Sequence, residues 1–523
     1  MNEPDAAGGA APAAPSRAPV SRSEDAAHAA RSGVSQILAM LGQGLLPLHR
    51  VLVARLFGQT AYGVYRTGAD LCEVLMRAGI AGGDKAMLKF VAAHRAVGET
   101  REETEALGSA LRLSGGVLLL LSLGLALGAP LFVRLWGNTA FGGVLPLLAP
   151  TVLGGGMVIV LMAATLAAKV TRVNLLVRGI CEPFLLVGIT LAVWYFRRDV
   201  YGAAAAHGLS TTLLFGLAWV GASAVLGRGR LREALRARPH RGLIKFALPL
   251  GAAEFLNSIL QRVNVFILSA YAGAGSVAVF AASEELGRSV AGLRYAFDSI
   301  AAPMMSEALH QGDRERLRYN LSLMIRWVAS ASAPIALTLL ALREPLLWLY
   351  GPGYVSGATA MGLLVCGHVV NGVLGLTGYV IVMAGRSRLF LWDNLVAALT
   401  NVVLSVLLIP RYGITGAAVA SLTSTSVLIG TLVVQVWVLE RVHPFNVAFF
   451  KPFLAAGIAL LGELAVRAIP LEPKLRVLLV AVTGLVIYPV ALLALRPGEE
   501  ERRFILNLVR RMFGRRGRGP DAA

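Results

Sequence analysis

Apolar stretches of about twenty residues recur along almost the whole chain, from Val34 to Leu495. A helix of that length crosses the hydrocarbon core of a bilayer. Charged residues make up only 15% of the 523 residues and hydrophobic residues 56%, whereas soluble domains carry roughly 25% charged residues. The sequence therefore excludes a soluble enzyme, a disordered protein and a disulfide-stapled secreted protein. It predicts a single all-α, polytopic membrane protein.

We expect about fourteen transmembrane helices. Their approximate limits are 34–54, 62–80, 108–128, 143–167, 175–195, 202–226, 244–270, 277–304, 320–341, 358–383, 389–409, 414–438, 449–468 and 476–495. The third, fourth, sixth, tenth, twelfth and fourteenth of these spans are nearly free of charge, so they are expected to face lipid.

Basic residues set the predicted orientation. Most of the 49 Lys and Arg residues fall on alternate connections and on the two tails, and cytoplasmic segments are the ones enriched in them. Both termini are therefore expected in the cytoplasm. The net charge of +19 is attributed to these loops and to anionic lipid, so no nucleic-acid partner is expected. The predicted organisation is a disordered tail (1–30), a six-helix half (31–227), a basic linker (228–242), a second six-helix half (243–440), two extra helices (441–495) and a basic tail with an amphipathic helix (496–523).

The two halves repeat one another at a nearly constant offset. Gly58 and the segment 62–65 (YGVY) correspond to Gly273 and the segment 277–280 (VAVF), 215 positions later, and the segment 202–206 (GAAAA) corresponds to 416–420 (GAAVA) at 214. Because the repeat unit holds an even number of helices, the halves are predicted to be parallel and related by an axis along the membrane normal. Such repeats typically enclose a central site.

Charged and polar side chains concentrate in the first two spans of each half. In the second span, the spacing of four ionisable residues places them all on one helical face. The stripes consist of Gln36, Gln43 and Arg50 in the first span, Arg66, Asp70, Glu73 and Arg77 in the second, Glu254, Asn257, Ser258 and Gln261 with the flanking Arg262 and Asn264 in the seventh, and Glu284, Glu285, Arg288, Arg294 and Asp298 in the eighth. An ionised side chain in a span costs roughly 2.5–3.5 kcal/mol, so the stripes are predicted to share one aqueous cavity.

An alternative explanation is that these charges form structural ion pairs. The i,i+4 pairs are Arg66–Asp70, Glu73–Arg77, Glu284–Arg288 and Arg294–Asp298. Pairing lowers the cost of insertion, and the sequence leaves both interpretations open.

Arginines in a cavity suit a polyanionic ligand, because guanidinium groups grip phosphate oxygens in a fork. Acidic neighbours that are partly desolvated could take up protons and couple transport to an ion gradient. None of the six lysines is followed by Ser or Thr, so a phosphate-binding loop is absent and no cofactor is expected. His207 and His368 are interpreted as helix-packing residues, and the three cysteines as small apolar residues without metal-ligand spacing.

Three segments resemble one known family. They are Val53–Tyr65 (VARLFGQTAYGVY), Ala384–Arg388 (AGRSR) and Ile409–Ala418 (IPRYGITGAA). They resemble the polysaccharide-exporting flippases of the Wzx type in the MOP exporter superfamily, over roughly residues 31–495. The resemblance implies fourteen helices in two lobes and the turning of an undecaprenyl-diphosphate-linked oligosaccharide from the inner to the outer leaflet.

The implied site combines the cavity arginines and the acidic stripes. Substrate contacts are expected from Arg50, Arg66, Arg262, Arg288, Arg294, Gln43, Asn257 and Gln261. Ion coupling is expected from Asp70, Glu73, Glu254, Glu284 and Glu285. The expected partners are a lipid-linked oligosaccharide, membrane lipids, and a polysaccharide polymerase with its chain-length proteins. A multidrug or cation antiporter and a flippase of the peptidoglycan precursor remain alternatives, and an enzyme is not expected because the predicted outer loops are short.

Overall fold

The structure is a computed structural model that describes residues 44–443, 445, 447–470 and 472–495. The predicted tails (1–30 and 496–523) and Gln43 lie outside the described residues. The described residues form helices and contain no strand, as the sequence predicts.

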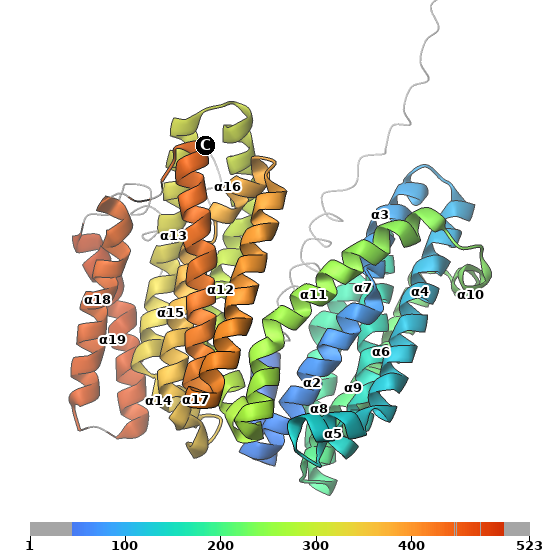
Figure 1. Ribbon diagram of the computed structural model, residues 1–523, viewed down its shortest axis with the longest axis horizontal. Helices are drawn as coiled ribbons and strands as arrows, with labels where there is room; N and C mark the ends of the chain where they lie inside the picture. Colours follow the sequence, from blue (N-terminus) through green and yellow to red (C-terminus); the bar gives the residue numbers. More distant parts are fainter. Residues whose placement is uncertain (1–43, 444, 446, 471, 496–523) are drawn as a thin grey trace, which may run out of the picture.

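Two helical lobes make up the fold (Figure 1). The first lobe contains a helix at residues 44–57, α2 (Gln59–Ile80), α3 (Gly83–Ala96), α4 (Thr100–Leu127), α5 (Ala129–Trp136), α6 (Phe141–Ala167), α7 (Thr171–Asn174), the π-helix η1 (Leu175–Cys181), α8 (Glu182–Phe196) and α9 (Val200–Leu226). The connecting helices α10 (Arg228–Arg236) and α11 (Arg241–Tyr271) follow.

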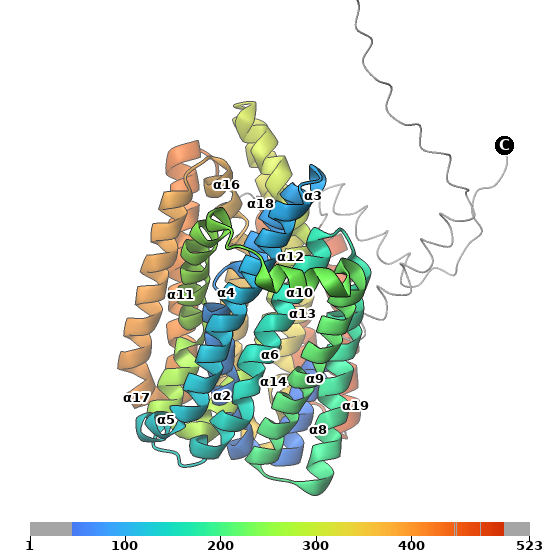
Figure 2. The same ribbon diagram turned by 90° about the vertical axis from the view of Figure 1, so that its right-hand side faces the viewer.

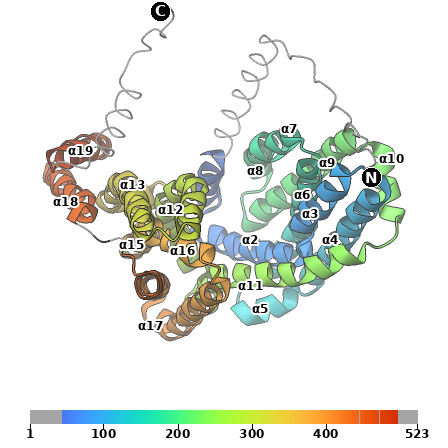
Figure 3. The ribbon, with the colours of Figure 1, turned by 90° about the horizontal axis from the view of Figure 1, so that it is seen from above.

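The second lobe contains α12 (Gly273–His310), α13 (Arg314–Ala341), α14 (Arg343–Trp348), η2 (Pro352–Gly357), α15 (Ala358–Leu374), α16 (Thr377–Met383), α17 (Ser387–Gln435), η3 (Val436–Glu440), α18 (Val447–Ala468) and α19 (Pro473–Ala494). The last two helices lie at the edge of this lobe farthest from the first lobe (Figures 1 and 3).

Ten described helical segments are long and apolar enough to cross a membrane. One of them, residues 387–440, contains two of the predicted spans. The two spans are separated by a kink in α17 at Gly413, where φ is +53°. Both α2 and α12 are long but carry several charges, which agrees with the polar stripes predicted for them. The chain is therefore a multi-pass membrane protein, and the total of fourteen spans stays a prediction.

The internal repeat is visible in the backbone. Gly58 directly precedes α2 and Gly273 is the first residue of α12, and both have a positive φ, +89° and +76°. Gly98 and Gly312, 214 positions apart, also have positive φ, and they precede α4 and α13, which are both 28 residues long. The fold thus consists of two pseudo-symmetric helical halves followed by α18 and α19.

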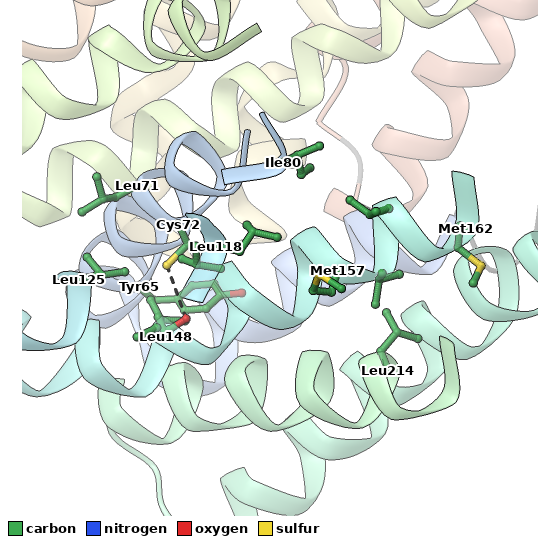
Figure 4. Packing of buried hydrophobic residues seen from close by; sticks show 14 of the residues in the cluster. Tyr65, Leu71, Cys72, Ile80, Leu118, Leu125, Leu148, Met157, Met162 and Leu214 are labelled. Atoms are coloured by element: carbon green, nitrogen blue, oxygen red, sulfur yellow. Dashed lines mark hydrogen bonds between the residues drawn. The ribbon is translucent and has the colours of Figure 1, made fainter. Parts of the chain in front are cut away.

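The first lobe is built around α6. Its neighbours are α2, α4 and α9, and Figure 2 shows α4, α6 and α9 running roughly side by side. Apolar side chains from these helices interlock, among them Leu118, Leu148, Met157 and Leu214 (Figure 4). The fourth predicted span (143–167) forms α6, and the expectation that it faces lipid is wrong, since 67% of the residues in its most apolar 18-residue stretch are buried inside the protein. A charge-free sequence suits a protein interior as well as a bilayer.

Two connecting helices join the lobes. The basic linker, predicted as a loop, forms α10, whose Leu231 and Ala234 are buried and whose neighbour is α4. The following helix, α11, contacts α2, α3, α4 and α5 of the first lobe and α12 and α17 of the second. It therefore belongs to both lobes in its packing, although the sequence assigns it to the second half.

Candidate functional site

Two cavities lie on either side of α2, and Arg66 and Asp70 line both. The cavity within the first lobe, called here the first-lobe cavity, has a volume of about 270 Å³, and its polar lining is His49, Arg50, Tyr62, Tyr65, Arg66, Asp70, Glu73, Arg77, Thr151, Arg178, Glu182, His207 and Thr211. The second-lobe cavity has a volume of about 190 Å³, and its polar lining is Arg66, Asp70, Gln261, Arg262, Asn264, Glu284, Glu285, Arg288, His368, Asn371, Asn401, Ser421, Ser424 and Thr425.

The charged face of α2 forms an ion-pair network with α11. Asp70 is 2% exposed and lies between two guanidinium groups: the Arg66 Nη2 is 2.8 Å from Asp70 Oδ1, and the Arg262 Nε is 3.3 Å from the same oxygen. The Arg262 Nη2 also lies 2.6 Å from Glu73 Oε2. This geometry arises because residues three and four apart share one helical face, and α11 packs against that face.

The charges of α12 complete the cavity walls. Glu285 forms an ion pair with Arg50 of the first lobe. Glu284 Oε1 lies 3.4 Å from Arg288 Nη2 and 3.3 Å from the His368 Nε2. Ion pairs therefore join the polar stripes of different helices.

The structural ion pairs expected from i,i+4 spacing are present in three of four cases. Besides Arg66–Asp70 and Glu284–Arg288, Arg294 Nε lies 3.7 Å from Asp298 Oδ1. Glu73 instead pairs with Arg262 of α11, and within the described residues Arg77 forms no salt bridge. Since a cavity lining and a structural pairing coexist here, the two interpretations of the charged stripes do not exclude each other.

A third cavity opens beside the first-lobe cavity. Its volume is about 510 Å³, and it is lined by Arg50, Glu285 and residues of η1 and α8, including Asn174, Arg178 and Glu182. A π-helix such as η1 often occurs at a functional site. Arg178 and Glu182 are themselves paired, with the Arg178 Nε 3.6 Å from Glu182 Oε2.

Most of the sequence-predicted site residues line these cavities. Those that do are Arg50, Arg66, Arg262, Arg288, Gln261, Asp70, Glu73, Glu284 and Glu285. Three described candidates do not: Asn257 is exposed, Glu254 pairs with Lys85 of α3, and Arg294 hydrogen-bonds to Asn371. Gln43 lies outside the described residues.

Sequence inspection missed several lining residues. Arg178 gives no clear signal in the sequence, because Glu182 is its only acidic neighbour on that helix and no polar stripe surrounds it. The two histidines interpreted as packing residues both line a cavity, and each makes a polar contact: His207 Nδ1 with the Tyr65 hydroxyl at 2.8 Å, and His368 with Glu284. The missed amides of α15 and α17, Asn371 and Asn401, were not distinguishable from polar residues elsewhere in those helices.

The two lobes are held together at the end where α2 and α12 begin. The rings of Tyr62 and Tyr354 are 6.4 Å apart, and Gln59 Nε2 donates to the Gly275 carbonyl at 3.2 Å. Arg55 donates to the Leu349 carbonyl at 2.7 Å and lies over the Trp348 ring. The ribbons of the two lobes diverge toward the opposite end, where α3, α10 and α16 lie (Figure 1).

Chemically, the three cavities together are lined by six arginines and five carboxylates. Guanidinium groups can exchange a carboxylate for a phosphate, since both accept the same forked pair of hydrogen bonds. Among the described residues, no group of three or more His, Cys, Asp and Glu side chains could hold a metal ion. The arrangement therefore presents guanidinium groups to which an anion could bind in place of a carboxylate.

The fold is that of known flippases and transporters. The structure of the lipid II flippase MurJ in an inward closed conformation is similar over 91% of this chain and 100% of that chain, with 14% identity and a TM-score of 0.67. An inward-facing multidrug resistance MATE family transporter of the MOP superfamily is similar over 78% of this chain and 98% of that chain, with 14% identity and a TM-score of 0.61. A variant of the Vibrio cholerae MATE transporter VcmN is similar over 78% of this chain and 97% of that chain, with 17% identity and a TM-score of 0.52.

No curated protein matches the chain in sequence. However, residues 30–309 match the family of polysaccharide biosynthesis proteins, and this match covers more than half of the chain. The multi-pass membrane protein described here therefore belongs to the polysaccharide biosynthesis protein family and has the fold of MOP-superfamily flippases and transporters.

Proposed function

We propose that the protein is a flippase for an undecaprenyl-diphosphate-linked oligosaccharide in the bacterial inner membrane, with both termini in the cytoplasm. It supplies a surface polysaccharide such as O-antigen, capsule or exopolysaccharide. In this role it moves its substrate without chemical change. A polysaccharide polymerase and its chain-length proteins would act on the delivered units.

The observation that carries this proposal is the presence of arginine-lined cavities on either side of α2 in an apolar protein. Insertion of an arginine into the membrane costs free energy, and the binding of an anionic ligand would explain why arginines are present there. The diphosphate of a lipid-linked sugar offers phosphate oxygens to guanidinium groups such as those of Arg50 and Arg66. The family match supports a substrate from polysaccharide assembly.

The contacts between lobes support alternating access. Tyr62, Gln59 and Arg55 hold the lobes together at the end that the distribution of basic residues assigns to the cell exterior. In this state the headgroup enters from the cytoplasmic side. Rocking of one lobe against the other would then break these contacts and open the outer end.

The carboxylates of the network provide the means for coupling to a cation. When the diphosphate displaces Asp70, Glu73, Glu284 or Glu285 from its arginine, that carboxylate loses its positive partner and becomes able to take up a cation. Glu254, which pairs with Lys85 outside the cavities, could contribute in the same way. Substrate release would return each carboxylate to its arginine and discharge the cation.

The direct test is extraction of polyprenyl-linked lipids from cells lacking the gene, with mass spectrometry of the attached sugars. The proposal expects a completed lipid-linked repeat unit to accumulate while the surface polymer is lost. Re-expression of the wild-type gene should restore the polymer, and the Arg50→Gln variant, present in the membrane at the wild-type level, should not.

Two related functions give different results in the same experiment. A flippase of the peptidoglycan precursor would be indispensable for growth, and its depletion would accumulate a lipid-linked disaccharide–peptide. A drug or cation antiporter, suggested by the near balance of charges in the cavities, would leave the lipid pool unchanged and alter drug or cation sensitivity.

A further inference from the structure

The polar side chains of the two main cavities differ in chemical type. The side-chain amides of the described lining residues, Gln261, Asn264, Asn371 and Asn401, all line the second-lobe cavity, together with three hydroxyl groups of α17. The described lining of the first-lobe cavity also has hydroxyl groups but contains no amide side chain, and it has four arginines and two histidines where the second-lobe cavity has three arginines and one histidine. The cavities therefore present different hydrogen-bonding surfaces to a ligand that spans both.

Some of these polar groups have a structural role. Asn264 is 7% exposed, its Nδ2 donates to Ser421 Oγ at 2.7 Å, and its Oδ1 accepts from Ser405 Oγ at 2.5 Å. These bonds tie α11 to both segments of α17. Both the NH₂ group and the oxygen of Asn264 are thus bonded within the protein, so this side chain is assigned a structural role.

Other groups on the same wall have hydrogen-bonding capacity left. Within the described residues, Gln261 and Thr425 make no side-chain hydrogen bond. Asn401 accepts a 3.4 Å bond from Ser405, and Asn371 accepts a 3.1 Å bond from Arg294, so the amide NH₂ of each remains unused within the protein. Four side chains from α11, α15 and α17 therefore offer unused hydrogen-bonding groups to one cavity.

Amide and hydroxyl groups suit a different ligand from arginine. A phosphate accepts hydrogen bonds, so it matches guanidinium groups, which only donate. A sugar hydroxyl both donates and accepts, so it matches an amide or hydroxyl side chain, which also does both. A wall that combines these groups recognises neutral, hydroxyl-rich ligands.

We propose that the second-lobe cavity is a sugar subsite and the first-lobe cavity the diphosphate subsite of one bipartite site. This inference rests on the proposed function and names how the substrate is divided between the lobes. The diphosphate contacts Arg50 and Arg178, and the sugars nearest to it contact Gln261, Asn371, Asn401 and Thr425. The shared residue Arg66 lies where the first sugar is joined to the phosphate.

The test measures binding of two lipids to the purified full-length protein in nanodiscs. One probe is undecaprenyl diphosphate without sugar, and the other is the undecaprenyl-linked oligosaccharide extracted from the deletion strain. The variant Q261A/T425V should raise the Kd of the sugar-bearing lipid by about tenfold, since it removes two hydrogen-bonding groups, and change that of the sugar-free lipid by less than about twofold. Arg50→Gln should weaken both lipids.

A matched control is Asn394→Ala, which removes an amide from the same helix α17. Asn394 donates to the Phe390 carbonyl within its own helix and does not line the cavity, so binding of both lipids should be unchanged. Asn401→Ala serves as a second test of the subsite should the double variant fold poorly. Unfolding curves of each variant establish that it is folded.

The outcomes separate this inference from the proposed function. If the wild-type protein binds both lipids and Q261A/T425V and N401A weaken both equally, or weaken neither, the sugar subsite is wrong while the flippase proposal stands. If the wild-type protein binds neither lipid, the proposed function fails and the subsite falls with it.

Discussion

Glu73 of α2 lies 2.6 Å from Arg262 of α11, although an arginine four residues along its own helix could have been its partner. This ion pair, with the 3.3 Å contact between Arg262 and Asp70, fixes α11 against α2. Because α11 also contacts the second lobe, the pair couples the charged face of α2 to the connection between the lobes.

Arg262→Gln should therefore destabilise the protein. It leaves the buried Asp70 with only Arg66 and removes the partner of Glu73, and loss of a charged hydrogen bond costs about 1.5–3 kcal/mol. A lower free energy of unfolding in detergent, measured with a chemical denaturant, would show this. The matched control is Arg77→Gln, which breaks no described salt bridge and should cost less than about 1 kcal/mol. The double variant R262Q/E73Q should recover part of the loss, and equal effects of R262Q and R77Q would contradict the network.

The glycines at the beginnings of α2 and α12 should tolerate substitution poorly. Gly58 and Gly273 have φ of +89° and +76°, and a positive φ of this kind costs a residue with a Cβ about 1–3 kcal/mol. Gly58→Ala and Gly273→Ala are each expected to lower the free energy of unfolding by that amount. Gly229→Ala in the exposed helix α10 is the control, because Gly229 has open space and an ordinary φ, and it should be neutral or slightly stabilising. Similar losses for all three variants would argue against a conformational cause.

The carboxyl group of Glu463 should be replaceable by an amide. Glu463 is 0% exposed in α18, Thr338 of α13 donates to it at 3.3 Å, and its second oxygen has no hydrogen-bond partner among the described residues. Glu463→Gln keeps the acceptor and removes an ionisable group from the membrane, so the thermal unfolding midpoint should stay constant or rise. Glu463→Ala leaves a cavity and an unpaired hydroxyl and should cost roughly 2 kcal/mol. A Gln variant as unstable as the Ala variant would show that the charge itself is needed.

The proposed orientation predicts which surfaces are accessible from outside the cell. Ser356 and Glu233 are both exposed. Ser356 belongs to η2, whose Tyr354 contacts Tyr62 at the end where the lobes meet, and Glu233 belongs to α10, which connects the lobes on the side predicted to be cytoplasmic. In a background without the native cysteines, Ser356→Cys should react with a membrane-impermeant maleimide in spheroplasts, whereas Glu233→Cys should react only after permeabilisation. The reverse labelling pattern would invert the topology and place the closed end of the lobes in the cytoplasm.

Local sequence properties determined much of this fold. Helix length and apolarity located the spans, since a bilayer fixes how many apolar residues a crossing requires. The 3.6-residue period placed Arg66, Asp70 and Glu73 on one face of α2, and the offset of about 215 positions between Gly58 and Gly273 revealed the repeat. Each of these inferences depends on residues that are close along the chain or on self-similarity, and both are visible without coordinates.

The tertiary structure decided which distant groups meet. It paired Glu73 with Arg262, placed Arg178 of a π-helix and the amide of Asn401 in cavity walls, and buried the apolar helix α6 inside a lobe. Sequence could not predict these outcomes, because an apolar face packs equally well against lipid or protein and a charge has many partners of opposite sign in the chain. The choice is made by which helix faces are brought together when the two lobes and α11 pack around α2.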